Sequence, residues 1–280
     1  MRGFAQFLRR YARNKGACMG FVVVLAMVLL SIAASVVSPF DPNKIDPSHA
    51  LKGPSTTHPF GTDPLGRDML SRILHGGRIS LTVGGVAVLI SGSIGIFLGL
   101  ISGYFGGRCD AIVMRAVDVL LSFPSILLAL LVVSILGPGI LNVMIAVGIS
   151  GIGQFARLAR AAVVQVKANF YVEAARAVGC PNRRIILRHI LPNIFPPVLT
   201  FATLRAATSI ISAASLSFLG LGAQPPAAEW GSMLSQGRNY FFSGWWVMLF
   251  PGLTILAVTL SLNLIGDGLR EIYDPKRKKV

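Results

Sequence analysis

Residues 79–102 read ISLTVGGVAVLISGSIGIFLGLIS, a run of 24 residues that contains no charged side chain. An α-helix rises 1.5 Å per residue, so about 20 apolar residues cross the hydrocarbon core of a bilayer. The backbone N–H and C=O groups of such a run find no water there, so they must bond to one another within a helix. The stretch therefore predicts a membrane-spanning helix.

Further apolar runs follow the same pattern, and together they predict an all-α membrane protein with about six transmembrane helices. Charged residues make up 13% of the chain, against about 25% in a typical soluble domain. The run nearest the N-terminus, residues 18–37, is longer than the core of a signal peptide, so we expect it to be retained as a helix. The other five runs cover residues 18–37, 116–136, 139–155, 194–221 and 245–266.

Basic residues gather on one side of this predicted bundle. Six crossings place both termini on the same side, together with loops 104–115 and 156–193. That side holds 19 Lys and Arg residues and four acids, whereas loops 38–78 and 220–244 hold six basic and five acidic residues. Because Lys and Arg are concentrated in cytoplasmic loops, we expect both termini in the cytoplasm. Topology then accounts for the net charge of +15, and no nucleic-acid partner is expected.

A glycine stripe runs along the helix predicted over residues 79–102. Gly95, Gly99 and Gly103 recur every four residues on one helical face. Small residues let another helix approach closely, and helix association in lipid depends on such packing. The stripe therefore predicts a neighbouring helix against this face. The alternative is glycine without a packing role, in a chain that contains 30 glycines.

The cytoplasmic loop contains YVEAARAVGCPNRRIILRHILPN, residues 171–193. Residues 170–178 predict a short helix that ends at Gly179. Asn182 is expected to cap a second helix, which should end at Pro192. Two short helices that meet at a glycine form a rigid protrusion, which suits docking into a partner and carries no catalytic group.

This loop resembles the hallmark of the permease subunits of ATP-binding-cassette (ABC) importers. The hallmark reads E-A-A, three residues, G, nine residues and I-x-L-P, and His189 stands here where isoleucine is expected. The resemblance implies a type I ABC importer permease fold whose coupling helix sits in a cleft of a cytoplasmic ATPase, with the first glutamate facing a basic group. The matching residues are Glu173, Ala174, Ala175, Gly179, Leu191 and Pro192.

Motifs along nearly the whole chain are similar to the C-type subunit of the dipeptide, oligopeptide and nickel permease group. The resemblance implies import of di- or oligopeptides by alternating access, with nickel, glutathione or another small solute as the alternative. These motifs are Gly61-Thr62-Asp63, Gly66-Arg67-Asp68, Gly103-Tyr104-Phe105-Gly106-Gly107, Ser217-Phe218-Leu219-Gly220-Leu221-Gly222, Pro225-Pro226, Glu229-Trp230-Gly231 and Asn263-Leu264-Ile265-Gly266-Asp267.

The same resemblance implies the partners and the location. It implies a second homologous permease subunit, two ATPase subunits and an external solute-binding protein, assembled in the plasma (inner) membrane of a prokaryote. The chain contains no G-x-x-x-x-G-K-[ST] phosphate loop. We therefore expect a translocation subunit that is not an enzyme and holds no cofactor, with ATP and Mg²⁺ bound by the ATPase subunits.

Two charged residues in predicted spans are candidate pore or gate residues. Asp118 lies near the cytoplasmic end of the third span, where we expect a gate or an interhelical salt bridge. Arg205 lies near the middle of the fifth span, where a charge costs about 2.5–3.5 kcal/mol. It is expected either to attract a peptide carboxylate or to form a salt bridge with the partner permease. On the outside, Glu229 and Trp230 are candidates for contact with the external binding protein or for capping the pore, with interfacial anchoring as the alternative.

No metal site is predicted. His58 and His75 fall in or near the loop 38–78 without further ligands at suitable spacing, so we expect a solvated loop there. The three cysteines are too scattered for a disulfide framework or a metal site.

The expected organisation has three parts. Residues 1–78 form a cytoplasmic segment, the first span and an external loop; residues 79–270 form a permease core of five spans with the coupling loop 156–193; residues 271–280 form a basic tail. The rival class is a secondary transporter, which would need ion sites near the middle of the membrane and usually internal repeats. Ionisable groups near the middle of the predicted spans are nearly absent apart from Arg205, and the sequence shows no convincing repeat.

Overall fold

The computed structural model describes residues 11–12 and 14–273. The basic residues predicted to mark the cytoplasmic side up to Arg13, and those of the tail after Tyr273, lie outside the described residues. The described part is helical and contains no strand beyond one isolated bridge, between Thr62 and Asp68. It confirms the all-α fold class.

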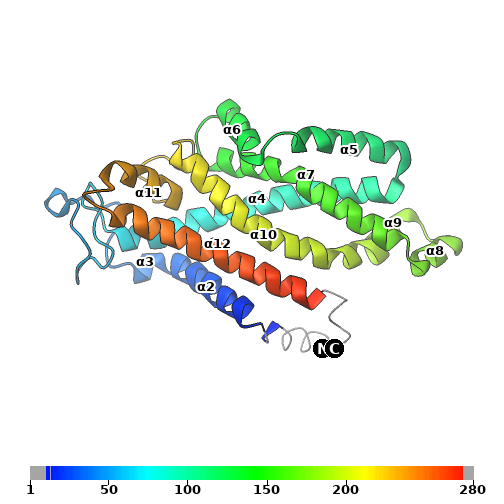
Figure 1. Ribbon diagram of the computed structural model, residues 1–280, viewed down its shortest axis with the longest axis horizontal. Helices are drawn as coiled ribbons and strands as arrows, with labels where there is room; N and C mark the ends of the chain where they lie inside the picture. The colour runs from blue at the N-terminus through cyan, green and yellow to red at the C-terminus, as the bar shows by residue number, and fades with distance from the viewer. Residues whose placement is uncertain (1–10, 13, 274–280) are drawn as a thin grey trace.

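The long helices run side by side along the longest axis of the molecule (Figure 1). Five described helices are long and apolar enough to cross a membrane, or six if one bent pair counts as a single span. The elements are α2 (Lys15–Ile32), α3 (Ala34–Val37), η1 (Pro47–His49), α4 (Met69–Phe105), α5 (Gly107–Leu121), α6 (Ser125–Leu136), α7 (Ile140–Lys167), α8 (Phe170–Ala177), α9 (Asn182–Ile185), the π-helix η2 (Ile186–Ile190), α10 (Leu191–Phe218), α11 (Trp230–Gly237), η3 (Arg238–Tyr240) and α12 (Trp246–Tyr273).

The centre of the bundle is the pair α4 and α7, and the glycine stripe is the reason that they lie so close. A Cβ atom added at Gly95 would stand 2.5 Å from the Cβ of Phe155. At Gly99 it would stand 2.6 Å from the carbonyl oxygen of Ala156, and at Gly103 it would stand 2.9 Å from the Cβ of Val163. No side chain fits between the helices at these positions, so the predicted packing role of the stripe is confirmed.

The molecule has two ends, and each collects particular segments. The loop end carries residues 38–68 and 219–245, at the left of Figure 1. The opposite end, at the right of Figure 1, carries the short helices α8 and α9; they form the predicted protrusion, which we call the elbow, and this end is the elbow end. The start of α2 and the end of α12 lie together, because Asn14 Nδ2 donates to Glu271 Oε2 at 2.7 Å.

The third predicted span, residues 116–136, contains a sharp bend at Pro124, a residue type that can bend a helix. The helix begins earlier, at Gly107, and α5 and α6 are bent by 87° at the break between them. Pro124 has no N–H to donate, and its ring disfavours the helical conformation of Phe123. The chain therefore turns at this proline.

The expected end of the second elbow helix at Pro192 is also wrong. α9 continues through η2 into α10, and the proline lies in the first turn of α10. The Leu191 N–H bonds to the Ile186 carbonyl, five residues back, which is the wide turn of a π-helix. A proline is tolerated in a first turn because its missing N–H would have no intrahelical partner there.

Candidate functional site

The elbow, residues 170–190, protrudes from one end of the described bundle (Figure 1). α8 ends at Ala177, and Gly179 has φ +79°, the left-handed conformation that glycine adopts at low cost. The predicted end of the first elbow helix at this glycine is therefore confirmed. Asn182 does not cap the second helix; its Oδ1 accepts a hydrogen bond from the Tyr104 hydroxyl at 2.6 Å.

The two faces of the elbow differ. Its underside is apolar and fixed to the bundle, since Val172, Ile185 and Ile190 are fully buried and Ala175 is nearly so. Its outer face is exposed and bears the Glu173 carboxylate beside Ala174. Phe170 and Val178 are 89% and 79% exposed, which is unusual for large apolar side chains outside the spans. The elbow thus offers a rigid outer face that combines apolar side chains with charge.

Leu191 and Pro192 are not part of this outer face. They form the start of α10, where Leu191 packs against the buried cluster beneath the elbow. The residues that match the hallmark are therefore divided between the protrusion and its support.

Asp118 pairs with Arg157 on the neighbouring helix, with its Oδ1 2.7 Å from Arg157 Nη2. Both side chains are more than half exposed, so the pair contributes little to stability. A second pair lies three residues further along α7, toward the elbow, where Arg160 Nη2 stands 2.5 Å from Asp110 Oδ2 and its Nε stands 2.6 Å from Oδ1. The two pairs tie α5 to α7. The Asp110 pair was not predicted, although both residues stood in neighbouring cytoplasmic segments.

Arg205 is buried inside the chain, between α10 and α7, with 8% of its surface exposed. Its Nη1 donates to Gln154 Oε1 at 3.0 Å, and a Cβ atom at Gly151 would stand 2.8 Å from its Nη2. Its Nε has no hydrogen-bond partner, and no carboxylate pairs with it among the described residues. Its role toward a substrate or a partner subunit stays a prediction.

The expected external contacts of Glu229 and Trp230 are wrong, because both side chains are buried. Glu229 is 3% exposed and accepts hydrogen bonds from the N–H groups of Gly231 at 2.9 Å and Ser232 at 2.8 Å. It is the N-cap of α11. Trp230 is fully buried, and its Nε1 donates to the carbonyl oxygen of Ile73 at 3.0 Å. They join α11 to α4 instead of meeting another protein.

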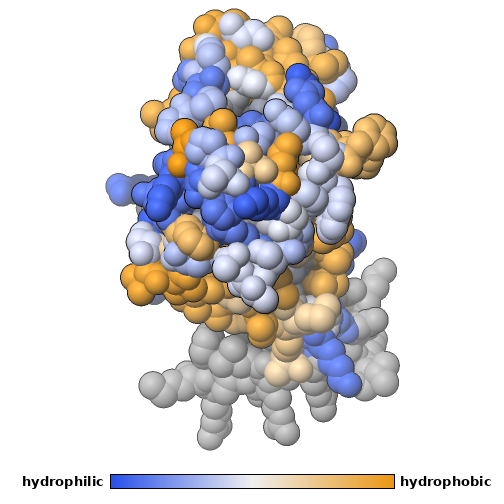
Figure 2. Space-filling model, turned by 90° about the vertical axis from the view of Figure 1, so that its left-hand side faces the viewer, coloured by the Kyte–Doolittle hydropathy of each residue, from blue (hydrophilic) through white to orange (hydrophobic). Residues whose placement is uncertain are grey.

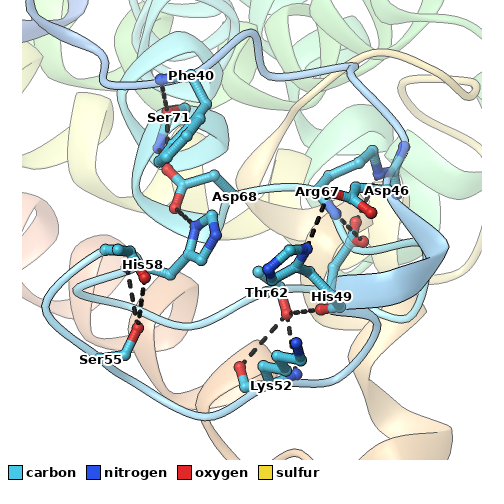
Figure 3. A network of polar contacts seen from close by, with 12 residues as sticks. Phe40, Asp46, His49, Lys52, Ser55, His58, Thr62, Arg67, Asp68 and Ser71 are labelled. Atoms are coloured by element: carbon cyan, nitrogen blue, oxygen red, sulfur yellow. Dashed lines mark hydrogen bonds and ion pairs between the residues drawn. The ribbon is translucent and has the colours of Figure 1, made fainter.

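The loop of residues 38–68 is folded by its own polar contacts and is more than a solvated loop (Figure 3). His58 is 13% exposed, and its Nδ1 lies 2.9 Å from Asp68 Oδ1. Asp68 in turn caps α4 by accepting from the Ser71 N–H at 2.8 Å. Among the described residues, no group of three or more His, Cys, Asp or Glu side chains is placed to hold a metal ion.

Buried charges complete this end. Arg67 Nε donates to Asp63 Oδ2 at 2.6 Å, and both side chains are at most 5% exposed. Arg67 Nη2 reaches Gln236 of α11 at 3.1 Å, so the loop is fixed to the bundle. Hydrophilic side chains gather in the middle of this face of the molecule, with hydrophobic ones above and below (Figure 2).

Comparison with known proteins identifies the family. Residues 95–279 match the model of the binding-protein-dependent transport system inner membrane component. Residues 4–54 match the N-terminal TM domain of oligopeptide transport permease C.

Relatives match along nearly the whole chain. The dipeptide transport system permease protein DppC of Alkalihalophilus pseudofirmus is 45% identical over 96% of this chain and 89% of its own length. The di/tripeptide transport system permease protein DppC of Pseudomonas aeruginosa is 43% identical over 98% of this chain and 92% of its own length. The glutathione transport system permease protein GsiD of Escherichia coli is 47% identical over 98% of this chain and 90% of its own length.

Solved structures share the fold. An inward-facing structure of the MetNI methionine ABC transporter covers 74% of this chain and 98% of its own, with a TM-score of 0.61 at 19% identity. The bundle of spans, the elbow and the full-length relatives agree. The chain therefore belongs to the binding-protein-dependent transport system inner membrane component family, the multi-pass permease subunits of ABC importers.

Proposed function

We propose that this chain is the translocation subunit of an ATP-driven importer of di- or oligopeptides. The observation that supports the substrate class is the 45% and 43% identity, over nearly the full chain, to relatives named for dipeptide and di/tripeptide transport. The relative named for glutathione is 47% identical, and glutathione is itself a tripeptide. Small peptides therefore unite the relatives better than nickel does.

The elbow is the place where we expect ATP hydrolysis to act on this chain. The sequence has no phosphate loop of its own, so hydrolysis belongs to partner ATPase subunits that bind ATP and Mg²⁺. The Glu173 carboxylate is exposed and makes no hydrogen bond or ion pair within the described residues. An exposed, unpaired charge on a rigid protrusion is available to a basic group of an ATPase cleft. Closure of the ATPases would then rock the bundle between inward-open and outward-open states.

The proposal includes an orientation in the membrane and the remaining partners. The elbow end faces the cytoplasm together with both termini, in agreement with the basic residues of that side. The loop end faces outward, where its folded, polar surface is suited to an external solute-binding protein. A second homologous permease subunit completes the pathway across the inner membrane of a prokaryote.

Uptake into liposomes tests the proposal. The complex is purified by a tag on this chain, reconstituted with its co-purifying subunits and binding protein, and supplied with a labelled dipeptide. We expect uptake only when ATP and Mg²⁺ are present on the elbow side. Uptake that follows an ion gradient without ATP would instead support a secondary transporter.

Two substitutions, each of which replaces an acid by its amide, test the role of the elbow. Glu173→Gln removes the charge without changing the shape, and the loss of a charge-assisted bond of about 1.5–3 kcal/mol predicts uptake lower by about 10-fold to 100-fold. Asp41→Asn is the matched control, because it removes an exposed acid at the loop end and keeps the oxygen that accepts from the Asn43 N–H. Equal uptake by the two variants would contradict the role of Glu173.

A further inference from the structure

The turn of residues 103–107, Gly-Tyr-Phe-Gly-Gly, links α4 to α5 at the elbow end and has no role in the function described so far. Gly106 and Gly107 have φ +68° and +54°, so the chain reverses there through conformations that favour glycine. Gly103 lies against α7, as described above. Tyr104 stands between these glycines and is only 3% exposed.

Tyr104 is the residue near the end of α4 that bonds to the elbow through its side chain. Its hydroxyl donates to Asn182 Oδ1 at 2.6 Å, which reaches α9. The Arg176 guanidinium of α8 lies 5.2 Å from the centroid of its ring, within the range of a cation–π contact. Lys167, the last residue of α7, donates to its carbonyl oxygen at 2.5 Å. One side chain and its peptide thus join four helices.

The opposite end of α4 is fixed as firmly. Its N-cap Asp68 belongs to the folded loop, and its Ile73 carbonyl and Ser80 hydroxyl bond to Trp230 and Glu229 of the α11 segment. Between these ends α4 is one unbroken helix of 37 residues, about 55 Å long. A displacement delivered to Tyr104 therefore moves a rigid rod that reaches the outward side.

We propose that Tyr104 is the joint through which the elbow moves the α4–α7 pair, and that its hydrogen bond to Asn182 makes this joint tight. Tyr104 is a positioning residue: it acts through α4 and touches neither solute nor nucleotide. The proposal rests on the proposed function, because it assumes that ATPase subunits drive the elbow. The apolar ring alone would suffice to fill the space beneath α8, whereas the hydroxyl serves to connect a buried helix end with an exposed asparagine of the elbow.

The ratio of ATP hydrolysed to dipeptide imported tests the joint in the reconstituted complex. A variant that only assembles less well lowers both rates together and leaves this ratio unchanged. Tyr104→Phe keeps the ring and loses the hydrogen bond, and Asn182→Leu removes the acceptor from the other side. Loss of one neutral hydrogen bond predicts a ratio higher by about five-fold in each variant, and no further rise in the double variant.

Two controls separate the hydrogen bond from other effects. Asn182→Asp keeps an acceptor oxygen at the same place and is expected to preserve the wild-type ratio. Tyr240→Phe removes a hydroxyl at the loop end that makes no hydrogen bond within the described residues, and it is also expected to preserve the ratio.

The outcomes are distinguishable from failure of the proposed function. If the wild-type complex shows no ATP-dependent uptake, the proposed function fails. If it does, a wild-type ratio in Tyr104→Phe or Asn182→Leu overturns the joint, and so does an equal rise in Tyr240→Phe. Because Asn182 is exposed, its variant reports on the joint even if Tyr104→Phe assembles poorly.

Discussion

A single methyl group added at Gly99 should force α4 and α7 apart. The Cβ of Gly99→Ala would stand 2.6 Å from the Ala156 carbonyl oxygen and 2.6 Å from the Ala159 Cβ. It would stand 2.8 Å from the Arg160 backbone nitrogen. Two of these three atoms belong to the backbone of α7, so no rotamer change can relieve the overlap. Non-bonded heavy atoms prefer separations of about 3.5–4.0 Å, so the helices must separate locally by about 1 Å.

The size of the effect follows from that displacement. A radial gap of about 0.5–1 Å forfeits roughly a quarter to a half of each dispersion contact along the interface. Overpacking of a well-packed core costs typically about 1–3 kcal/mol. Because backbone atoms oppose the methyl group here, we expect a loss near the top of this range, about 3 kcal/mol of the free energy of unfolding.

Gly85→Ala is the matched control on the same helix. A Cβ atom there meets no other atom within 4 Å, so the substitution adds only helix propensity, worth up to about 1 kcal/mol. Unfolding of the detergent-solubilised protein by added SDS, followed by circular dichroism, gives the free energy of unfolding of each variant. Gly99→Ala should be less stable than the wild type and Gly85→Ala at least as stable. Equal stability of the two variants would refute the account of the stripe.

Three further predictions concern the loop end and the buried cation. Glu229→Ala should lower the free energy of unfolding by about 1–2 kcal/mol through loss of the N-cap of α11, measured by the same titration, and it should leave capture of the binding protein intact. The hydrogen bond from Ser48, followed by that from a neighbouring histidine, lowers the pKa of Asp46 below its usual value. The ionised Asp46 side chain therefore contributes stability to the loop above its usual pKa, and this contribution is lost as the pH falls through the lowered pKa. Ser48→Ala should raise the Asp46 pKa, as measured by a carboxyl ¹³C NMR titration. Arg205→Met leaves the Gln154 carbonyl oxygen without its donor and should cost about 1–3 kcal/mol, most of which Gln154→Leu should restore in a double-mutant cycle; no recovery would show that the two side chains are not coupled.

Sequence patterns predicted the spans and the elbow because both depend on short-range chemistry. A run such as residues 79–102 must be helical in lipid whatever surrounds it. Gly179 ends a helix because of its own backbone freedom, and the stripe at Gly95, Gly99 and Gly103 could be placed on one face by helical spacing alone. What the spacing could not supply was the identity of the neighbour, which the structure shows to be α7.

The candidate site was predicted less completely, because short stretches of sequence do not show which side chains are buried or which distant residues they contact. Glu229 and Trp230 resembled surface residues because charged and aromatic side chains are common at membrane boundaries. Both side chains are buried, however: Glu229 caps α11, and Trp230 donates to the carbonyl oxygen of Ile73, far away in the sequence. Tyr104 stood within a recognisable motif, but its partner Asn182 is 78 residues away along the chain.

By itself, the sequence determined that this chain is a membrane-embedded helical bundle with a short helix that ends at Gly179, because hydrophobic length and helix-ending glycines act over a few residues. Only the tertiary structure decided which helix lies against the glycine stripe, that Pro192 begins α10 instead of ending a helix, and which side chains connect the two ends of α4 to other helices. Those outcomes depend on which helices meet, and that choice is made by packing between segments far apart in the chain.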